Sequence, residues 1–244
     1  MKLDHMTWLE VESYLAQKNG IFLSTGSMEQ HGPMGLIGTD ALCASAIAEK
    51  AADLTSAICA PGFSYTPAPF NTAFPGTVSI SAELFLALVS EVVAGLSAQG
   101  FTRIYIVNGH GANLAPLSQL APPAGTLVRY RSWWDFEPVN VLRKDYYGDW
   151  EGMHATPSEI AITQALHRRI EPSETAKQPP RKLSPDYMRA HSGDRHGPPD
   201  QHRRDFPDGR VGSHSALATP EHGRQLFEAA AAAIAEDFSA FCRS

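Results

Sequence analysis

The sequence has few cysteines, no basic stretch and no long apolar run, and each absence excludes a class of protein. Its three cysteines, Cys43, Cys59 and Cys242, lie far apart without a CxxC pair, which argues against a disulfide framework and a thiolate zinc site. The 20 basic residues are outnumbered by 26 acidic ones, which gives a net charge of −6, so we expect no nucleic-acid partner. No stretch approaches the roughly 18 consecutive apolar residues of a membrane span, and the N-terminus lacks an apolar signal core. We therefore expect no membrane association and a cytoplasmic protein.

The composition and the order of the apolar segments predict one α/β domain over residues 1–244. Hydrophobic residues make up 43% of the chain and charged residues 19%, so a sizeable core is available. Short apolar runs alternate with longer segments of helical periodicity, which predicts βαβ units and a mostly parallel sheet covered on both faces. The predicted strands cover 21–26, 56–62, 103–109 and 126–134, and the main predicted helices cover 7–18, 40–54, 81–99 and 220–241.

A long polar excursion separates the last helix from the rest of the chain. Residues 171–219 are rich in proline and almost free of aliphatic side chains, and they are too long for an ordinary connection. We expect an ordered functional segment, an oligomer contact or a partly disordered region. His191, His196, His202 and His214 lie in it at spacings of 5, 6 and 12 residues, which match no zinc motif, so a solvated loop is favoured over a metal site.

Polar side chains that suit a metal centre follow the predicted strands. Functional groups of open parallel sheets gather at the carboxyl ends of the strands, so these side chains are expected at one edge of the sheet. Imidazoles and carboxylates suit a first-row divalent cation, and this set is large enough for two ions that share a carboxylate. The candidates are Glu29, His31, Asp40, His110, Asn113, His154 and Glu159.

Each candidate also has a purely structural alternative. Asp40 precedes a helix and is typical of an N-cap, and Thr156 to Glu159 has the spacing of a capping box. His110 lies between two glycines in a turn that also resembles a phosphate-binding loop, although Leu114 stands where a dinucleotide fingerprint needs glycine. A non-catalytic binder of small molecules or nucleotides, with the same fold and no bound metal, is therefore the alternative function.

Five motifs in a fixed order resemble the creatininase (creatinine amidohydrolase) family. The resemblance extends from about residue 20 to about residue 225. It implies a three-layer α/β/α sandwich, a homo-oligomer that is most often a hexamer, and one or two divalent metals. It also implies hydrolysis of C–N bonds in cyclic or small amides. The motifs are GSMEQHGPMGLIGTD, FPGTVSI, NGHGAN, an HA loop with a Glu five residues after its His, and GRVGSHSALATPEHGR.

The resemblance also assigns metal ligands. Its E-x-H…D pattern falls on Glu29, His31 and Asp40, and the histidine of its NGH motif is His110. Glu29 and His110 are then expected to hold one metal and His31 the other, with Asp40 bridging the two. The chemistry of these ligands does not select among Zn, Mn and Fe.

Two departures from the family pattern bear on the substrate and the second metal. Creatininases have a Glu two residues after the NGH histidine, and Ala112 stands there in this chain, which argues against creatinine as the substrate. In other branches the Glu of the HA loop takes that role, so Glu159 is expected to be the second-metal ligand. His154 matches the catalytic histidine and is expected to relay a proton to the leaving nitrogen. The predicted function is hydrolysis of a small cyclic amide, a formamide or a related amide by a metal-activated water.

Overall fold

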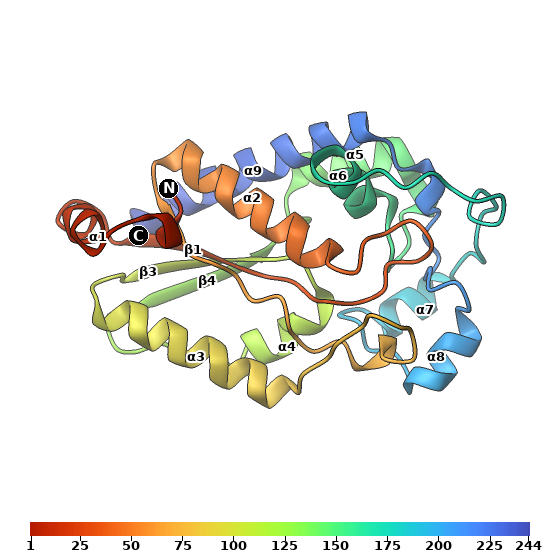
Figure 1. Cartoon of the computed structure of the whole chain (residues 1–244), viewed down its shortest axis with the longest axis horizontal. Helices are drawn as coiled ribbons and strands as arrows, with labels where there is room; N and C mark the ends of the chain where they lie inside the picture. Colours follow the sequence, from red (N-terminus) through yellow and green to blue (C-terminus); the bar gives the residue numbers. More distant parts are fainter.

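A four-stranded parallel sheet forms the centre of the computed structural model, which describes all 244 residues. The strand order is β2-β1-β3-β4, and helices cover both faces (Figure 1). In the register of the sheet, Ile21 lies between Ile58 and Ile104. The predicted three-layer α/β/α architecture is confirmed. The strands are β1 Gly20–Thr25, β2 Ile58–Cys59, β3 Arg103–Asn108 and β4 Leu127–Ser132.

Strand β2 is shorter than the segment 56–62 that the sequence predicts. The chain beyond Cys59 still follows β1, because Ala60 N donates to Phe22 O and Phe63 N donates to Ser24 O. The two donors are three residues apart, whereas their acceptors on β1 are two apart, so one extra residue interrupts the regular ladder. The prediction was therefore right about the path of this segment and wrong about its regularity.

The helices form two layers around the sheet. Helix α9 packs against α2, α5 and α6 on one face, whereas α3 and α4 cover the other (Figure 1). None of the helices combines the length and the apolar composition needed to cross a bilayer. The helices are α1 Trp8–Leu15, α2 Thr39–Thr55, α3 Ala82–Ala98, α4 Leu114–Leu117, α5 Glu137–Tyr147, α6 Pro157–Leu166, α7 Pro185–Ala190, α8 Pro199–Asp205 and α9 Pro220–Cys242, with short 3-10 turns at Leu3–His5, Pro69–Asn71, Gly111–Asn113, Gly148–Trp150 and Ser215–Leu217.

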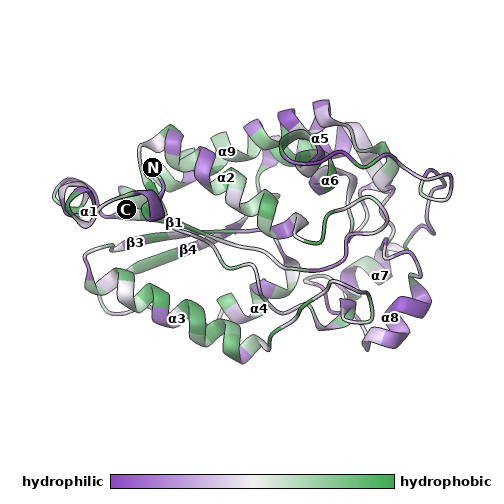
Figure 2. Cartoon of the chain, viewed as in Figure 1, coloured by the Kyte–Doolittle hydropathy of each residue, from purple (hydrophilic) through white to green (hydrophobic).

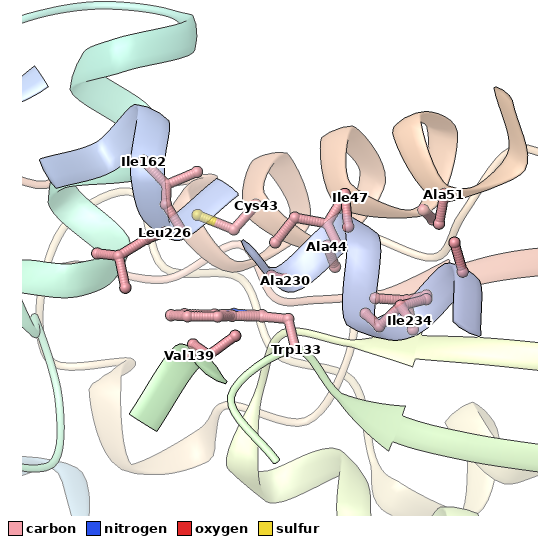
Figure 3. Packing of buried hydrophobic residues seen from close by; sticks show 14 of the residues in the cluster. Cys43, Ala44, Ile47, Ala51, Trp133, Val139, Ile162, Leu226, Ala230 and Ile234 are labelled. Atoms are coloured by element: carbon pink, nitrogen blue, oxygen red, sulfur yellow. The ribbon is translucent and has the colours of Figure 1, made fainter. Parts of the chain in front are cut away.

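The core is divided by the sheet into two unequal parts. Successive strand residues point to opposite faces, so Phe22 joins the cluster under α2 and α9, and Ile21 joins the one under α3. The first cluster has 28 buried residues and the second 12, so most of the apolar burial holds α2, α6 and α9 in place. Figure 3 shows Trp133 in the larger cluster with Val139 and Leu226. That helical layer carries two of the candidate site residues.

The excursion is more ordered than a solvated loop. It contains α7 and α8, which lie at the end of the sheet toward which β1 runs (Figure 1). Helix α8 is hydrophilic over most of its surface, in contrast to the largely hydrophobic α3 (Figure 2). Nevertheless, His202 and Phe206 are buried against this same chain, and the His196 side chain is 1% exposed. The expectation of a solvated histidine segment was wrong for His196 and His202, because both rings pack beside Phe70.

Candidate metal centre

The loop between β1 and α2 brings the first three candidates together. Glu29 N donates to Ile37 O, which folds the loop back on itself. A Cβ at Gly26 would meet Ala41 N at 2.2 Å, so glycine is needed where the end of β1 touches the start of α2. As a result, the buried side chains of Glu29, His31 and Asp40 face one another.

Asp40 lies between two imidazoles rather than at a helix cap. The N-cap of α2 is Gly38, and Asp40 is in the first turn. Its Oδ1 is 2.8 Å from His31 Nε2, its Oδ2 is 2.9 Å from His110 Nδ1, and Ser27 Oγ donates to Oδ2 at 2.8 Å. The structural alternative for Asp40 is therefore excluded by geometry.

Backbone carbonyls fix which nitrogen of each histidine faces the centre. His110 Nε2 lies 2.7 Å from Pro67 O, which leaves Nδ1 toward Glu29 and Asp40. His31 Nδ1 lies 3.1 Å from Glu29 O, which leaves Nε2 toward Asp40. Such partners orient histidines that bind metals, because a nitrogen that donates to a carbonyl cannot also be the ligand.

Glu159 forms the capping box and also lies close to the other candidate ligands. Thr156 N donates to Glu159 Oε1, and Glu159 N donates to Thr156 Oγ1, so the capping box is formed. The same Oε1 lies 3.9 Å from His31 Nε2, and the residue is buried. The N-terminus of α6 thus holds this carboxylate at the edge of the centre.

His154 is buried beside the same carboxylates. Its Nε2 lies 2.7 Å from Gln30 O and its Nδ1 lies 3.7 Å from Glu29 Oε1. The ring packs against His31, with the two centroids 4.5 Å apart. Burial lowers the pKa of His154, against the opposing effect of Glu29, so the neutral imidazole is favoured.

The carboxylates dominate the protonation of the other two histidines. Burial disfavours the charged imidazole of His31, but Asp40 and Glu159 raise its pKa to about 10. Burial likewise opposes charge on His110, and Glu29 and Asp40 raise its pKa well above the ordinary value. Burial acts to raise the pKa of Asp40, yet His31 and His110 hold it far below its usual range. Burial raises the pKa of Glu159 to about 8 despite His31.

These side chains form three groups whose donor atoms lie within 4.8 Å of one another. Two of the groups share Asp40, which agrees with the bridging position that the family resemblance implies. The third group offers His154 as a ligand instead of a proton carrier. The groups are Glu29–Asp40–His110, His31–Asp40–Glu159 and Glu29–His31–His154.

A divalent cation fits this set of donors. Glu29 Oε1 is buried and has no hydrogen-bond partner, and its neighbour His110 Nδ1, 3.1 Å away, is shared with Asp40. An orphaned buried carboxylate oxygen is costly unless a cation satisfies it. Imidazole nitrogens and carboxylate oxygens together suit Zn, Mn and Fe.

Several residues around the centre were not predicted from the sequence. Asn71 Nδ2 donates to Glu29 Oε2 at 2.9 Å, and it comes from a proline-rich loop that has no strand or helix pattern. Asp194 comes from the polar excursion, and its Oδ2 lies 3.7 Å from His110 Nδ1. Asn108 and the candidate Asn113 hold the backbone near the centre, since Asn108 Nδ2 donates to His110 O and Asn113 Nδ2 donates to Gly26 O.

A cavity of about 300 Å³ opens onto the centre. Glu29, Asp40, His110, His154 and Glu159 all line it, so the candidate ligands are accessible to a small molecule. The remaining wall includes Trp133, Trp134, Arg143, Met153, Met188 and Asp194.

Comparisons with known proteins agree with this architecture. The model of the creatininase family, creatinine amidohydrolase, matches residues 4–238. A creatinine amidohydrolase of Pseudomonas putida is 25% identical over 182 residues, which cover 66% of this chain and 70% of that protein. A mycofactocin precursor peptide peptidase of Mycolicibacterium smegmatis is 36% identical over 117 residues, and the match covers 45% of each protein. A solved structure described as creatininase with Mn has a TM-score of 0.76 and 22% identity, with 97% of this chain and 96% of that chain covered, which shows a shared fold.

Proposed function

The chain belongs to the creatininase family, whose members are hydrolases that act on C–N bonds, and from this premise we propose a metal-dependent amidohydrolase. Its substrate is a small cyclic amide, a formamide or a related amide. Creatinine is disfavoured, because Ala112 stands where creatininases carry a ligand Glu. The volume of the cavity, about 300 Å³, suits a molecule of this size.

The observation that carries the proposal is the cluster of buried carboxylates that share two imidazoles. Glu29, Asp40 and Glu159 would bring three negative charges into one buried site if both histidines were neutral. Burying that charge without compensation is prohibitive, and protons or divalent cations are the two available sources of positive charge. Two divalent ions, one for each group that contains Asp40, would replace the protons on the histidines and on Glu159.

The ligands divide between two positions. Glu29 and His110 would hold one ion and His31 and Glu159 the other, with Asp40 within reach of both. Divalent cations bound here supply Lewis-acid chemistry, because they lower the pKa of water and stabilise negative charge on a carbonyl oxygen. The carbonyls of Pro67 and Glu29 keep the imidazoles turned toward these positions.

His154 is proposed to move the proton of the reaction. His154 Nε2 lies 2.7 Å from Gln30 O, and also 3.0 Å and 3.2 Å from the amide nitrogens of Gln30 and Asn71. We assign the hydrogen of the neutral ring to Nε2, on the shortest of these contacts, which leaves the lone pair on Nδ1 near Glu29. Burial lowers the pKa of His154 and so keeps the ring neutral, and the proposal is that Nδ1 then accepts a proton during attack of water on the amide carbon. The same proton is then returned to the nitrogen that leaves.

Elemental analysis and a substrate screen test the proposal together. Protein purified without chelator is expected to carry one to two equivalents of Zn, Mn or Fe per chain and to hydrolyse a subset of small amides and lactams. Removal of the metal with a chelator should abolish turnover, and re-addition should restore it. Protein that neither carries nor rebinds stoichiometric metal would favour the alternative function, a non-catalytic binder.

We also propose a homo-oligomer, most often a hexamer in this family. The support is the family resemblance together with the exposed apolar side chains of the excursion and α3, such as Met188 and Leu84. Light scattering at micromolar concentration measures the mass directly. A monomer of 26.5 kDa would remove this part of the proposal and leave the catalytic part standing.

A further inference from the structure

One carboxylate on the cavity wall lies outside the three groups of candidate metal ligands. Asp194 lines the cavity, and its side chain is 11% exposed. It belongs to none of the three groups whose donor atoms come within 4.8 Å of one another. Its Oδ2 is 3.7 Å from His110 Nδ1, so a molecule bound beside the centre is within its reach.

The backbone at Asp194 has an unusual conformation. Gly193 and Asp194 both have left-handed conformations, with φ of +72° and +56°. Such a conformation costs free energy at a residue other than glycine, although Asp and Asn tolerate it best. The turn carries the chain from α7 down to the carboxyl ends of the strands, where the Asp194 carboxylate enters the cavity.

The turn after β3 leaves room for the same carboxylate at Gly111. A Cβ at Gly111 would lie 2.2 Å from Asp194 Oδ2 and 2.9 Å from its Cγ. Any other residue at position 111 would therefore displace the carboxylate. Gly111 and Asp194 are 83 residues apart in the sequence, and their fit is a second, independent sign that the position of Asp194 matters.

The carboxylate lacks a hydrogen-bond donor within the chain. The nearest imidazole nitrogen of its own segment, His196 Nε2, is 3.8 Å from Asp194 Oδ1, which is too long for a hydrogen bond. The only other charge on the wall outside the centre is Arg143, which Glu151 neutralises at 3.0 Å. The nearest ring nitrogen of the centre, His110 Nδ1 at 3.7 Å, already contacts Glu29 and Asp40. Asp194 is therefore the one carboxylate on this wall, outside the proposed ligands, that is free to accept a hydrogen bond from a ligand.

We propose that Asp194 is a substrate-binding residue and that it selects amides carrying a protonated amine or another cationic N–H group close to the scissile bond. A largely buried carboxylate without a donor gains most from a ligand that brings both a donor and a positive charge. This inference rests on the proposed function, because it names the substrate class of the same cavity.

Glycinamide and propanamide form the matched pair of probes. They have the same number of non-hydrogen atoms, and an ammonium group in one replaces a methyl group in the other. Binding to the metal-loaded protein is followed by tryptophan fluorescence, since Trp133 and Trp134 line the cavity. We expect glycinamide to bind on the order of tenfold to a hundredfold more tightly, the range for a charge-assisted hydrogen bond.

Asp194→Asn is the informative variant. Asn keeps the shape of the side chain and tolerates the left-handed backbone, so folding and metal content should stay unchanged. The preference for glycinamide should be lost in this variant, because the ammonium group must then leave water without a carboxylate to meet it. Asp200→Asn, an exposed change in α8 of the same segment, is the control and should retain the full preference.

Three results would overturn the assignment. They are a wild-type protein without preference, an Asp194→Asn protein that keeps the preference, and an Asp194→Asn protein that loses metal, which would make Asp194 a ligand. Because the experiment measures binding, its outcome does not depend on whether the protein hydrolyses amides. Amide hydrolysis without the preference leaves the enzyme standing, and the preference without hydrolysis leaves the binding site standing.

Discussion

The two halves of the metal centre are built from different kinds of structure. Glu29, Asp40 and His110 come from the ends of β1 and β3 and the start of α2, and no helix cap competes for their side chains. In the second half, Glu159 comes from the first turn of α6, where its carboxylate also caps the helix. The side chains of the first half cap no helix, whereas Glu159 in the second half also caps α6.

The second half shows that a helix-capping carboxylate can also be a candidate metal ligand. A capping box places a carboxylate at a helix N-terminus, a region whose dipole favours negative charge. In this chain the Glu159 carboxylate that caps α6 lies 3.9 Å from His31 Nε2, so the cap and the proposed ligand position coincide within one side chain. Four predictions test how far the two halves differ.

Loss of Asp40 should have the largest effect, since Asp40 is common to both halves. We expect Asp40→Asn to abolish metal binding at both positions and with it all activity, because the neutral amide replaces the one carboxylate that both histidines contact. Metal content and circular dichroism measure the outcome. Asp53→Asn, an exposed change in the same helix, is the control, and normal activity in Asp40→Asn would exclude a bridging position.

Glu159→Gln should separate the halves. Gln still completes a capping box, so stability without metal should change by well under ~1 kcal/mol. The second metal and activity should be lost, while the first metal stays. Thr156→Ala is the converse control, because it removes the cap hydroxyl at a cost of about 1 kcal/mol and should leave both metals bound. Two metals and normal turnover in Glu159→Gln would reduce Glu159 to its capping role.

His154→Ala tests whether His154 carries a proton or binds metal together with Glu29 and His31. As the proton carrier, His154 should be dispensable for metal binding, and its loss should reduce kcat by roughly 10²–10⁴. Elemental analysis beside steady-state kinetics distinguishes the two possibilities. If an ion is lost together with activity, then His154 binds metal with Glu29 and His31, and the proton carrier lies elsewhere.

The smallest expected effect is a difference between the two halves in how metal affinity depends on pH. Carboxylates raise the pKa of His110, so an ion in the first half displaces one proton, and its affinity should fall about tenfold per pH unit as pH decreases. In the second half His31, with a pKa of about 10, and Glu159, raised by burial to about 8, both carry protons below pH 8. Affinity there should fall about a hundredfold per unit. Calorimetric titration of the metal-free protein at pH 6 to 8 should resolve the two slopes, and equal slopes would contradict the difference.

The sequence alone was sufficient for the fold class and for the residue types of the centre. Alternation of short apolar runs with helical segments predicted the parallel sheet, because side-chain periodicity is a local property. The motifs after the strands gave Glu29, His31 and His110, because functional groups of such sheets follow the strand ends. The length of β2 was misjudged, since the extra residue between Ala60 and Phe63 becomes visible only against the partner strand β1.

Only the tertiary structure decided how these residues act together. That Asp40 contacts two imidazoles depends on close backbone approaches at Gly26 and Gly109, where a Cβ would meet the start of α2 at 2.2 Å and 2.4 Å. No pattern in the polar sequence around Asp194 predicted its position. Its side chain reaches the centre because Gly193 and Asp194 have left-handed conformations and Gly111 has no side chain to displace the carboxylate. Contacts between segments so far apart in the chain follow from packing, which no local pattern of residues encodes.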